Sequence, residues 1–167
     1  DYSVEGKEEE AQFDAALNMT LKTIEFARER EAIPFAVFKP TGFGRLALYE
    51  KVGDKAHLTE NEQKEWNRVI ERFDIACKTA FEKDVLLLID AEESWMQDAA
   101  DVIVTDMMRK YNKQKAIVFN TLQMYRWDRL DYLKNLHDQA KAEGFFIGMK
   151  LVRGAYMEKE NERAEAR

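Results

Sequence analysis

The sequence predicts an α/β fold in which strand–helix units repeat around a parallel sheet. Four short apolar runs, typical of buried strands, start near residues 35, 85, 116 and 146, and each is followed by a helical pattern. The last two intervals are close to 30 residues, about the length of one unit in an eight-stranded barrel of ~250 residues. Such units form a parallel sheet, and their spacing alone leaves open whether that sheet is open or closed.

Composition limits the class of protein. The 167 residues fit a single domain, and the 46% of hydrophobic residues can fill a packed core. The net charge of −6 argues against non-specific nucleic-acid binding. No run approaches the ~20 apolar residues that span a membrane. Because the chain starts at Asp1 rather than at Met, we expect a piece of a longer protein.

The first part of the chain alternates helix, strand and loop. Apolar residues recur at helical spacing over residues 9–30. Residues 34–39 are a compact apolar run that Pro40 closes, as expected of a strand. Residues 42–58 are the least regular part, a loop with a short helix over residues 46–52.

A capping-box pattern, Thr59 with Glu62, opens the next helix. Its predicted buried face consists of Trp66, Val69, Ile70, Phe73, Ala76, Cys77 and Ala80. Cys77 is the only cysteine, which suits a reducing compartment, and this position favours a buried structural thiol over a nucleophile. Residues 85–89 are unbroken apolar, which predicts a strand buried on both faces.

Ser94 with Gln97 forms a second capping-box pattern, and residues 116–119 form the next predicted strand. Residues 126–143 have a helical pattern that Gly144 ends. The predicted inward-facing residues of this helix are Leu130, Leu133, Leu136 and Ala140.

The last strand, residues 146–152, leads into a segment with unusual chemistry. Lys150 and Arg153 bring positive charge, Gly154 allows close approach to the main chain, and Tyr156 offers a flat face. This combination favours an anionic or electron-accepting planar ligand, and the alternative is a strand end with ordinary surface cations.

Other predicted strands also end in polar residues. The polar residues at the strand ends are Lys39, Asp90, Gln123, Lys150 and Arg153. Each alone is explained by a solvated strand end, but parallel strands bring their carboxyl ends to one edge, where ligands bind. Together they predict a binding site.

Neither the two histidines nor the charged end of the sequence predicts a functional site. His57 and His137 have no partner at metal-ligand spacing, so we predict surface histidines and no metal site. Residues 158–167 are a charge run, predicted to be a solvated helix start or a frayed tail.

Five stretches, in the same order along the chain, resemble the landmarks of one family. They are Asp-Tyr-Ser-Val-Glu at residues 1–5, Phe-Lys-Pro-Thr at 38–41, Leu-Ile-Asp-Ala-Glu-Glu at 88–93, Asn-Thr-Leu-Gln-Met-Tyr at 120–125 and Lys-Leu-Val-Arg-Gly-Ala-Tyr at 150–156. The family is proline dehydrogenase, the FAD enzymes that oxidise L-proline to 1-pyrroline-5-carboxylate. The resemblance implies a distorted (β/α)8 TIM-like barrel, of which residues 1–167 supply roughly the first five strands as an N-terminal, incomplete part.

The resemblance also assigns roles to residues. It implies a catalytic role for Asp90 and Lys150, cofactor binding by Ala91, Gln123, Lys150, Arg153, Gly154 and Ala155, and substrate binding by Lys39 and Tyr156. Lys150 matches a residue near the flavin N5, which takes the hydride, where some members have Arg. We expect Asp90 to face Lys39 and Arg153 and to hold both cations in place.

The same resemblance implies partners and a location. The partners are L-proline and a quinone or other electron acceptor. The implied location is cytoplasmic, with peripheral contact at the inner membrane. The family's carboxyl-terminal substrate clamp is absent from the sequence, so we expect this chain alone to be inactive. The alternative is a non-catalytic fragment that self-associates through open sheet edges. An unrelated barrel that binds a phosphorylated ligand is disfavoured, because no Gly-rich phosphate loop is present.

Overall fold

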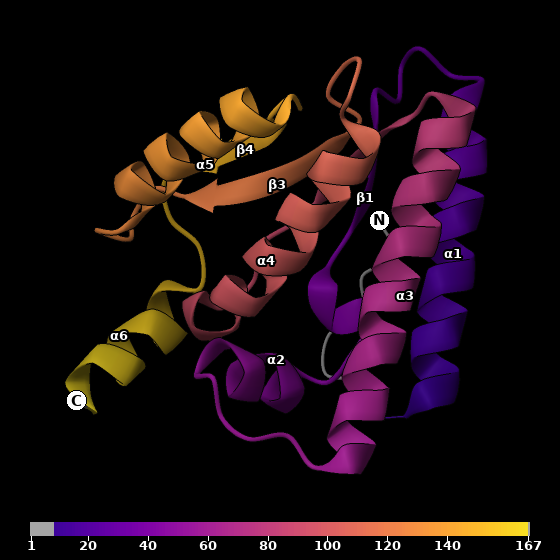
Figure 1. The fold of residues 1–167 in the computed structure, drawn as a ribbon. Coiled ribbons are helices and arrows are strands. Elements are labelled where there is room, and N and C mark those ends of the chain that lie inside the picture. The colour runs from indigo at the N-terminus through magenta and orange to yellow at the C-terminus, as the bar shows by residue number, and fades with distance from the viewer. Residues whose placement is uncertain (1–8, 167) are drawn as a thin grey trace.

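The centre of the fold is a four-stranded sheet in which all strands are parallel (Figure 1). The computed structural model describes residues 9–166. The strands follow chain order across the sheet as β1 (Phe35–Phe38), β2 (Leu86–Ile89), β3 (Val118–Gln123) and β4 (Met149–Val152). Sequential parallel strands joined by helices are the arrangement of a barrel wall. The strand predicted at residues 1–5 lies outside the described residues.

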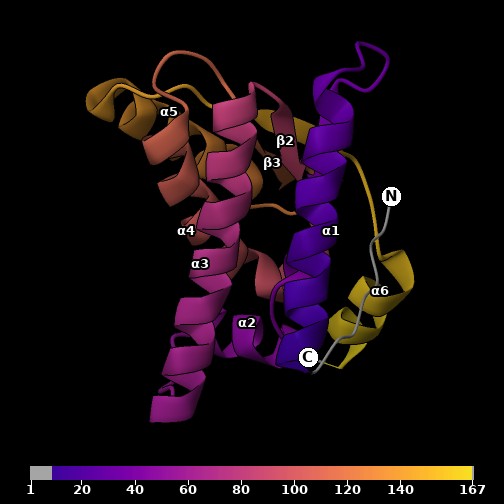
Figure 2. The same ribbon diagram turned by 90° about the vertical axis from the view of Figure 1, so that its right-hand side faces the viewer.

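Helices connect the strands and gather largely on one face of the sheet (Figures 1 and 2). They are α1 (Glu10–Arg28), α2 (Leu46–Gly53), α3 (Glu60–Lys83), α4 (Ser94–Tyr111), α5 (Arg129–Glu143) and α6 (Met157–Glu165), with a 3-10 turn at Pro40–Gly42. Most predicted elements agree with these bounds within a few residues. No helix in residues 9–166 has the length and apolar character needed to cross a membrane.

The helix signals in the sequence have mixed outcomes. The Thr59 capping box is confirmed: Thr59 Oγ1 accepts from the Glu62 amide at 3.3 Å, and the Glu62 carboxylate accepts from the Thr59 amide at 2.9 Å. Gly144 ends α5 with φ of 68°, as predicted. The Ser94 capping box is wrong, because the N-cap of α4 is Glu93, whose side chain makes no cap hydrogen bond. The other half of that pattern, Gln97, instead donates to Asp101 at 2.8 Å.

The two faces of the sheet differ in burial. Side chains alternate across a strand, so Leu87 and Ile89 are buried under the helices while Leu86 and Leu88 are half-buried on the other face. The prediction that residues 85–89 are buried on both faces is therefore wrong for the part of the chain described. The half-buried face corresponds to the inner side of a barrel wall.

Strand β3 is longer than predicted because its polar end is hydrogen-bonded internally. Asn120 donates to Asp101 on α4 at 2.8 Å, and Thr121 Oγ1 donates to the carbonyl of Ile89 at 2.9 Å. Gln123 Nε2 donates to the carbonyl of Glu92 at 2.6 Å. These partners allow polar side chains to be buried in a strand.

The inward face of α5 was predicted incorrectly at one position. Leu130 is 53% exposed, whereas the neighbouring Arg129 is 4% exposed. Arg129 turns inward because its guanidinium pairs with the buried Asp101 at 2.6 Å, and a buried carboxylate requires such a partner. The prediction also placed Ile70 on a buried face, and Ile70 is 37% exposed.

Gly148 lies just before β4, close to the backbone of β3, and this close approach predicts how a larger residue there affects stability. A Cβ on Gly148 would lie 2.5 Å from the carbonyl oxygen of Val118 and 2.7 Å from Cγ of Phe119. We expect Gly148→Ala to lower the free energy of unfolding by about 1–3 kcal/mol, since backbone must move to accept the methyl group. Urea unfolding followed by circular dichroism measures this. Gly154→Ala is the control, because its Cβ would meet nothing within 4 Å; equal effects of the two changes would contradict the prediction.

Candidate active site at the carboxyl ends of the strands

The parallel sheet brings the predicted site residues to one edge. Lys39 follows β1, Asp90 and Ala91 follow β2, Gln123 ends β3, Lys150 lies in β4, and Arg153, Gly154, Ala155 and Tyr156 connect β4 to α6. The segments come from distant parts of the chain, and strand order alone makes them neighbours.

Asp90 and Lys150 form an ion pair across this edge, although 60 residues separate them. The main chain of Asp90 is fixed from β1, where its amide donates to the carbonyl of Phe38 at 2.9 Å. Thr121 lies between the two charges: it pairs with Lys150 in the sheet register, and its hydroxyl lies 3.4 Å from Asp90 Oδ1. The carboxylate and the ammonium are thus held by three neighbouring strands.

This ion pair corrects the expectation that Asp90 holds Lys39 and Arg153. The partner of Asp90 is Lys150, because the register of β3 and β4 places Lys150 beside Thr121 and hence beside the end of β2. Arg153 is exposed and has no ion pair within residues 9–166. Lys39 is directed to Tyr156 instead.

Lys39 and Tyr156 form a second contact across the edge. The ammonium of Lys39 donates to the Tyr156 hydroxyl at 3.2 Å and lies 5.8 Å from the ring centre. The ammonium of Lys159 lies 5.4 Å from the same ring centre. Tyr156 is half-buried, with Lys39 bonded to its hydroxyl and Lys159 within cation–π distance of its ring.

Glu92 is a buried residue of the site that the sequence reasoning missed. It is 1% exposed, and its carboxylate accepts from the Thr41 amide at 2.9 Å and the Thr41 hydroxyl at 2.6 Å. Burial raises the pKa of Glu92 above its ordinary value, opposed by the Thr41 hydrogen bonds and by the charge of Lys39. Its place two residues after Asp90 was the available signal, but an acidic strand end usually indicates solvent exposure.

Gln123 carries an unpaired acceptor. Its amide nitrogen is used by the Glu92 carbonyl, and its Oε1 is buried with no hydrogen-bond partner among the described residues. Leaving such an atom unpaired costs about 1–3 kcal/mol. An N–H donor of a ligand at this edge would remove that cost, so Gln123 fits a planar heterocycle with ring N–H groups.

The charge run that begins at Glu158 is the solvated helix start that was predicted, because α6 has no buried residue; the contact of α6 with the start of α4 was not predicted. Lys159 pairs with Glu93 at 2.6 Å, Glu160 accepts from Ser94, and Arg163 lies 4.8 Å from the ring centre of Trp95. The signal was hidden because charged residues on one side of a short helix look the same whether they face solvent or a buried partner.

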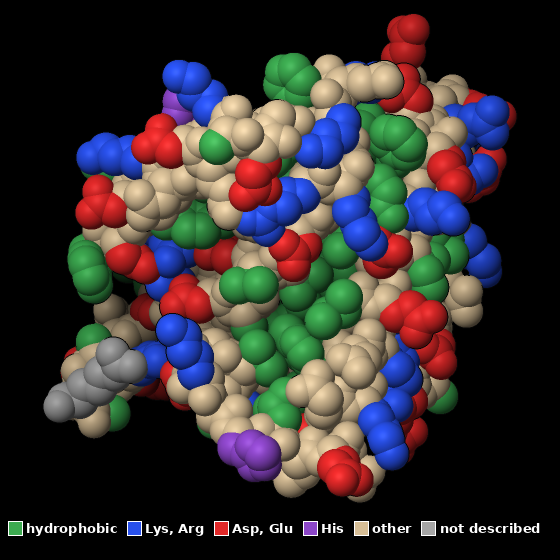
Figure 3. All heavy atoms as spheres, viewed as in Figure 1, with side chains coloured by type: hydrophobic (Ala, Val, Ile, Leu, Met, Phe, Trp, Pro, Cys, Tyr) green, Lys and Arg blue, Asp and Glu red, His purple; other side chains and the backbone are tan. Residues whose placement is uncertain are grey.

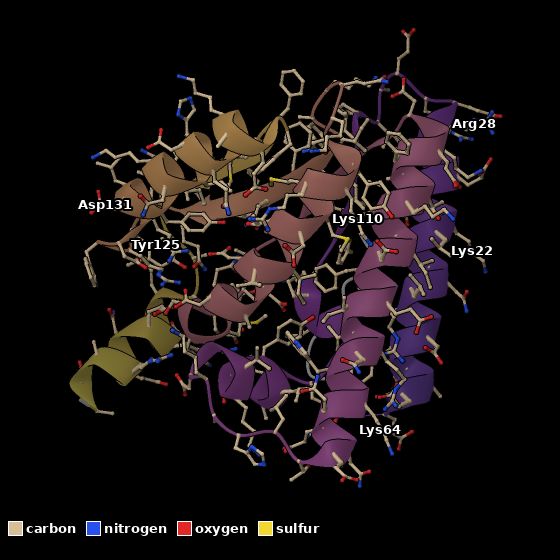
Figure 4. All side chains as sticks on the ribbon, in the orientation of Figure 1. Lys22, Arg28, Lys64, Lys110, Tyr125 and Asp131 are labelled. Carbon is tan, nitrogen blue, oxygen red and sulfur yellow. The ribbon has the colours of Figure 1, made fainter. Side chains whose placement is uncertain are left out.

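Other polar residues lie away from this edge. His57 and His137 are exposed, as predicted, and no cluster of His, Cys, Asp or Glu in the described residues is arranged to hold a metal ion. Cys77 is fully buried and burial raises the pKa of its thiol, which confirms a structural role. The outer helix surface carries ordinary charges such as Lys22 and Lys64, which point away from the sheet (Figure 4).

An apolar pocket of about 260 Å³ lies on the outer side of the helices, between α2, α3 and α4 (Figure 3). Trp66, Ile70, Val102, Ile103 and Met107 line it, with carboxylates at its rim. It lacks the converging polar groups of a reaction centre, which is why the strand ends are the better candidate site.

A segment of parallel barrel wall with polar groups at its carboxyl edge defines an α/β protein of the (β/α)8 class. The chain belongs to the proline dehydrogenase family, whose family model matches residues 1–167.

Two relatives illustrate the similarity. The carbapenem antibiotics biosynthesis protein CarD of Pectobacterium carotovorum subsp. carotovorum is 38% identical over 160 residues, 96% of this chain and 43% of that protein. Mitochondrial proline dehydrogenase 1 of Drosophila melanogaster is 40% identical over 111 residues, 66% of this chain and 16% of that protein. The chain thus spans less than half the length of these relatives.

Solved structures confirm the predicted fold class. Proline utilization A of Bradyrhizobium japonicum superposes with a TM-score of 0.80 at 16% identity, over 98% of this chain and 17% of that chain. The enzyme from Bdellovibrio bacteriovorus gives 0.77 at 17% identity, over 99% and 18%. The sheet described above is therefore part of a TIM-type barrel.

The raised pKa of Glu92 predicts a pH dependence. Just above its ordinary pKa of 4.5, the folded chain keeps a proton that the unfolded chain has released, so this carboxyl lowers stability as pH rises. We expect the free energy of unfolding of the wild type to fall relative to that of Glu92→Gln between about pH 4.5 and neutrality. Urea unfolding at several pH values measures the difference. A difference between the wild type and Glu92→Gln that stays constant over this pH range would refute the prediction.

Proposed function

We propose that this chain forms the flavin side of an FAD-dependent site that oxidises L-proline to 1-pyrroline-5-carboxylate. One observation carries the proposal: in a chain of the proline dehydrogenase family, the Asp90–Lys150 ion pair and the unpaired Gln123 oxygen share one edge of the barrel wall. A cation held beside an unfilled hydrogen-bond acceptor suits a planar, electron-accepting ring system.

The residues present fit FAD. Gln123 would accept from the ring system through its unpaired oxygen, and the Ala91 main chain would contact it beside Asp90. Gly154 has open space around its Cα, so a ligand can approach the main chain there, with Arg153 and Ala155 on either side. When bound, FAD supplies an acceptor for the hydride that leaves a ring carbon next to the proline nitrogen.

Lys150 is the proposed electrostatic catalyst. Its ammonium would stabilise the negative charge that accumulates on the acceptor as the hydride is transferred. Asp90 would keep that ammonium in position through the ion pair before the hydride is transferred. Asp90 thus positions the Lys150 ammonium and does not act as a base. The amine proton of proline is released to water.

Lys39 and Tyr156 form the proposed substrate side. A cation at Lys39 attracts the proline carboxylate, and the Tyr156 ring offers an apolar surface to the pyrrolidine ring. Their mutual hydrogen bond of 3.2 Å holds the two in one arrangement. The electron acceptor is proposed to be a quinone or another oxidant. The protein is proposed to be cytoplasmic, with peripheral contact at the inner membrane.

Titration of the chain with FAD, followed by flavin fluorescence and the visible spectrum, tests the cofactor site. We expect saturable binding, and about tenfold weaker binding for Gln123→Leu, because the lost hydrogen bonds are worth roughly 1–2 kcal/mol. Gln114→Leu, at an exposed loop position, is the matched control and should bind FAD like the wild type. FAD binding that is unaffected by Gln123→Leu would place the flavin elsewhere.

Replacement of Lys39 tests the substrate side. We expect Lys39→Met to raise the L-proline concentration that half-saturates the change in the visible spectrum of the bound flavin by about tenfold or more, since an ionic hydrogen bond to the carboxylate is lost. Titration of the flavin-loaded chain with L-proline under anaerobic conditions measures binding without requiring turnover. Lys134→Met on the outer face of α5 is the control. An unchanged half-saturation would remove Lys39 from the substrate side.

Self-association is the second candidate function. Within residues 9–166, β4 pairs on one side only, so its outer edge offers a second copy unpaired backbone groups. A mass that rises with concentration in light scattering, without FAD binding, would favour this role over the enzymatic one.

A further inference from the structure

Helix α6 connects two parts of the proposed site that the sheet does not join. It follows the Arg153–Tyr156 connection at the end of β4, and it lies beside the start of α4, which follows Asp90 and Ala91 (Figure 1). Residue pairs 66 positions apart in the chain make the contact.

Glu160 makes the central contact by capping α4. Its Oε1 accepts from the Ser94 amide at 2.8 Å and its Oε2 from the Ser94 hydroxyl at 2.7 Å. Ser94 is the first residue of α4, and the N-cap Glu93 makes no side-chain cap bond. A carboxylate from another helix thus satisfies a helix N-terminus that lacks its own cap, and the helix dipole favours the negative charge.

The same residue is bonded to the proposed substrate-binding tyrosine. The amide of Glu160 donates to the carbonyl of Tyr156 at 2.9 Å, in the first turn of α6. Glu160 therefore links Tyr156, through its own main chain and side chain, to the start of α4.

Tyr156 needs such a link because its backbone is strained. Its φ of 55° lies in the left-handed region, which costs a non-glycine residue about 1 kcal/mol or more. Such a conformation persists when surrounding contacts fix it. Lys39 holds the ring from β1, and Glu160 holds the carbonyl from α6.

We propose that Glu160 is a positioning residue, which anchors α6 to α4 and thereby holds residues 153–156 in the conformation that binds flavin and substrate. The inference rests on the proposed function for its ligand, but the anchoring itself is independent of any ligand. Lys159 with Glu93 and Arg163 with Trp95 flank the anchor on the same side of α6.

The experiment compares Glu160→Gln with Glu158→Gln. Both residues lie in the first turn of α6, so both changes remove the same charge from that helix end, but only Glu160 contacts Ser94. The first readout is hydrogen–deuterium exchange of Ser94 and residues 153–156 in the chain without flavin. The second is the dissociation constant and visible spectrum of bound FAD, and the third is the thermal unfolding midpoint.

For Glu160→Gln we expect about tenfold faster exchange at these positions and about tenfold weaker FAD binding, as for loss of a charge-assisted hydrogen bond. Exchange should rise most at these positions, the unfolding midpoint should fall by no more than the loss of one such hydrogen bond accounts for, and Glu158→Gln should resemble the wild type in every readout. Ser94→Ala removes only the hydroxyl bond and keeps the amide bond to Glu160, so we expect it to speed exchange less than Glu160→Gln does.

Two results would overturn the proposal. One is equal exchange at residues 153–156 in both variants; the other is an unfolding midpoint that drops together with faster exchange throughout the chain, which would make Glu160 a general stabilising residue. Failure of the proposed function gives a different result: the wild type would not bind FAD, while the exchange difference between the variants would still decide the role of Glu160.

Discussion

The arrangement of the site depends on how residues 92–94, directly after β2 and Asp90-Ala91, are hydrogen-bonded to their neighbours. Glu92 accepts from Thr41 beyond β1 through its side chain and from Gln123 of β3 through its carbonyl. Glu93 accepts from Lys159 and Ser94 donates to Glu160, both on α6, which follows β4. Three residues therefore connect the carboxyl ends of all four described strands. Sheet hydrogen bonds fix the strands themselves, but the side chains beyond the strand ends need these additional contacts to be held in place.

The charges at this edge are arranged in opposite pairs rather than as one sign. Asp90 pairs with Lys150 and Glu93 with Lys159, while Lys39 lowers the electrostatic cost of the buried Glu92. In this chain, whose net charge is −6, local carboxylates hold two of the cations that lie at this edge. Pairing also means that the cations are oriented before the ligand arrives, which is what electrostatic catalysis requires.

The sequence predicted the architecture well because hydrophobic periodicity is a local property. The strand and helix pattern, the Thr59 cap and the Gly144 stop are each encoded within a few neighbouring residues. Two of the failures involve distant partners: Leu130 is exposed while Arg129 pairs with Asp101, and Ser94 is bonded to Glu160 of α6 instead of capping α4. The same limit applies to the site. Strand ends identified which residues gather at the edge, but the partner of Asp90 follows from the β3–β4 register, which no local pattern contains.

The unpaired oxygen of Gln123 is the feature that most directly connects this structure to ligand binding. The buried Oε1 of Gln97 is also unpaired, but Gln97 lies in the helix layer, on α4, where its amide nitrogen donates to Asp101. Gln123 lies instead at the end of a strand, on the edge that holds Asp90 and Lys150, the groups that a ligand is proposed to contact. Folding leaves this acceptor unpaired at a cost of about 1–3 kcal/mol, and a bound ring N–H would recover that cost. At the binding edge a ligand can donate to the unpaired acceptor, and the recovered free energy adds to ligand affinity. Inside the helix layer no ligand donates, so the unpaired acceptor only lowers stability.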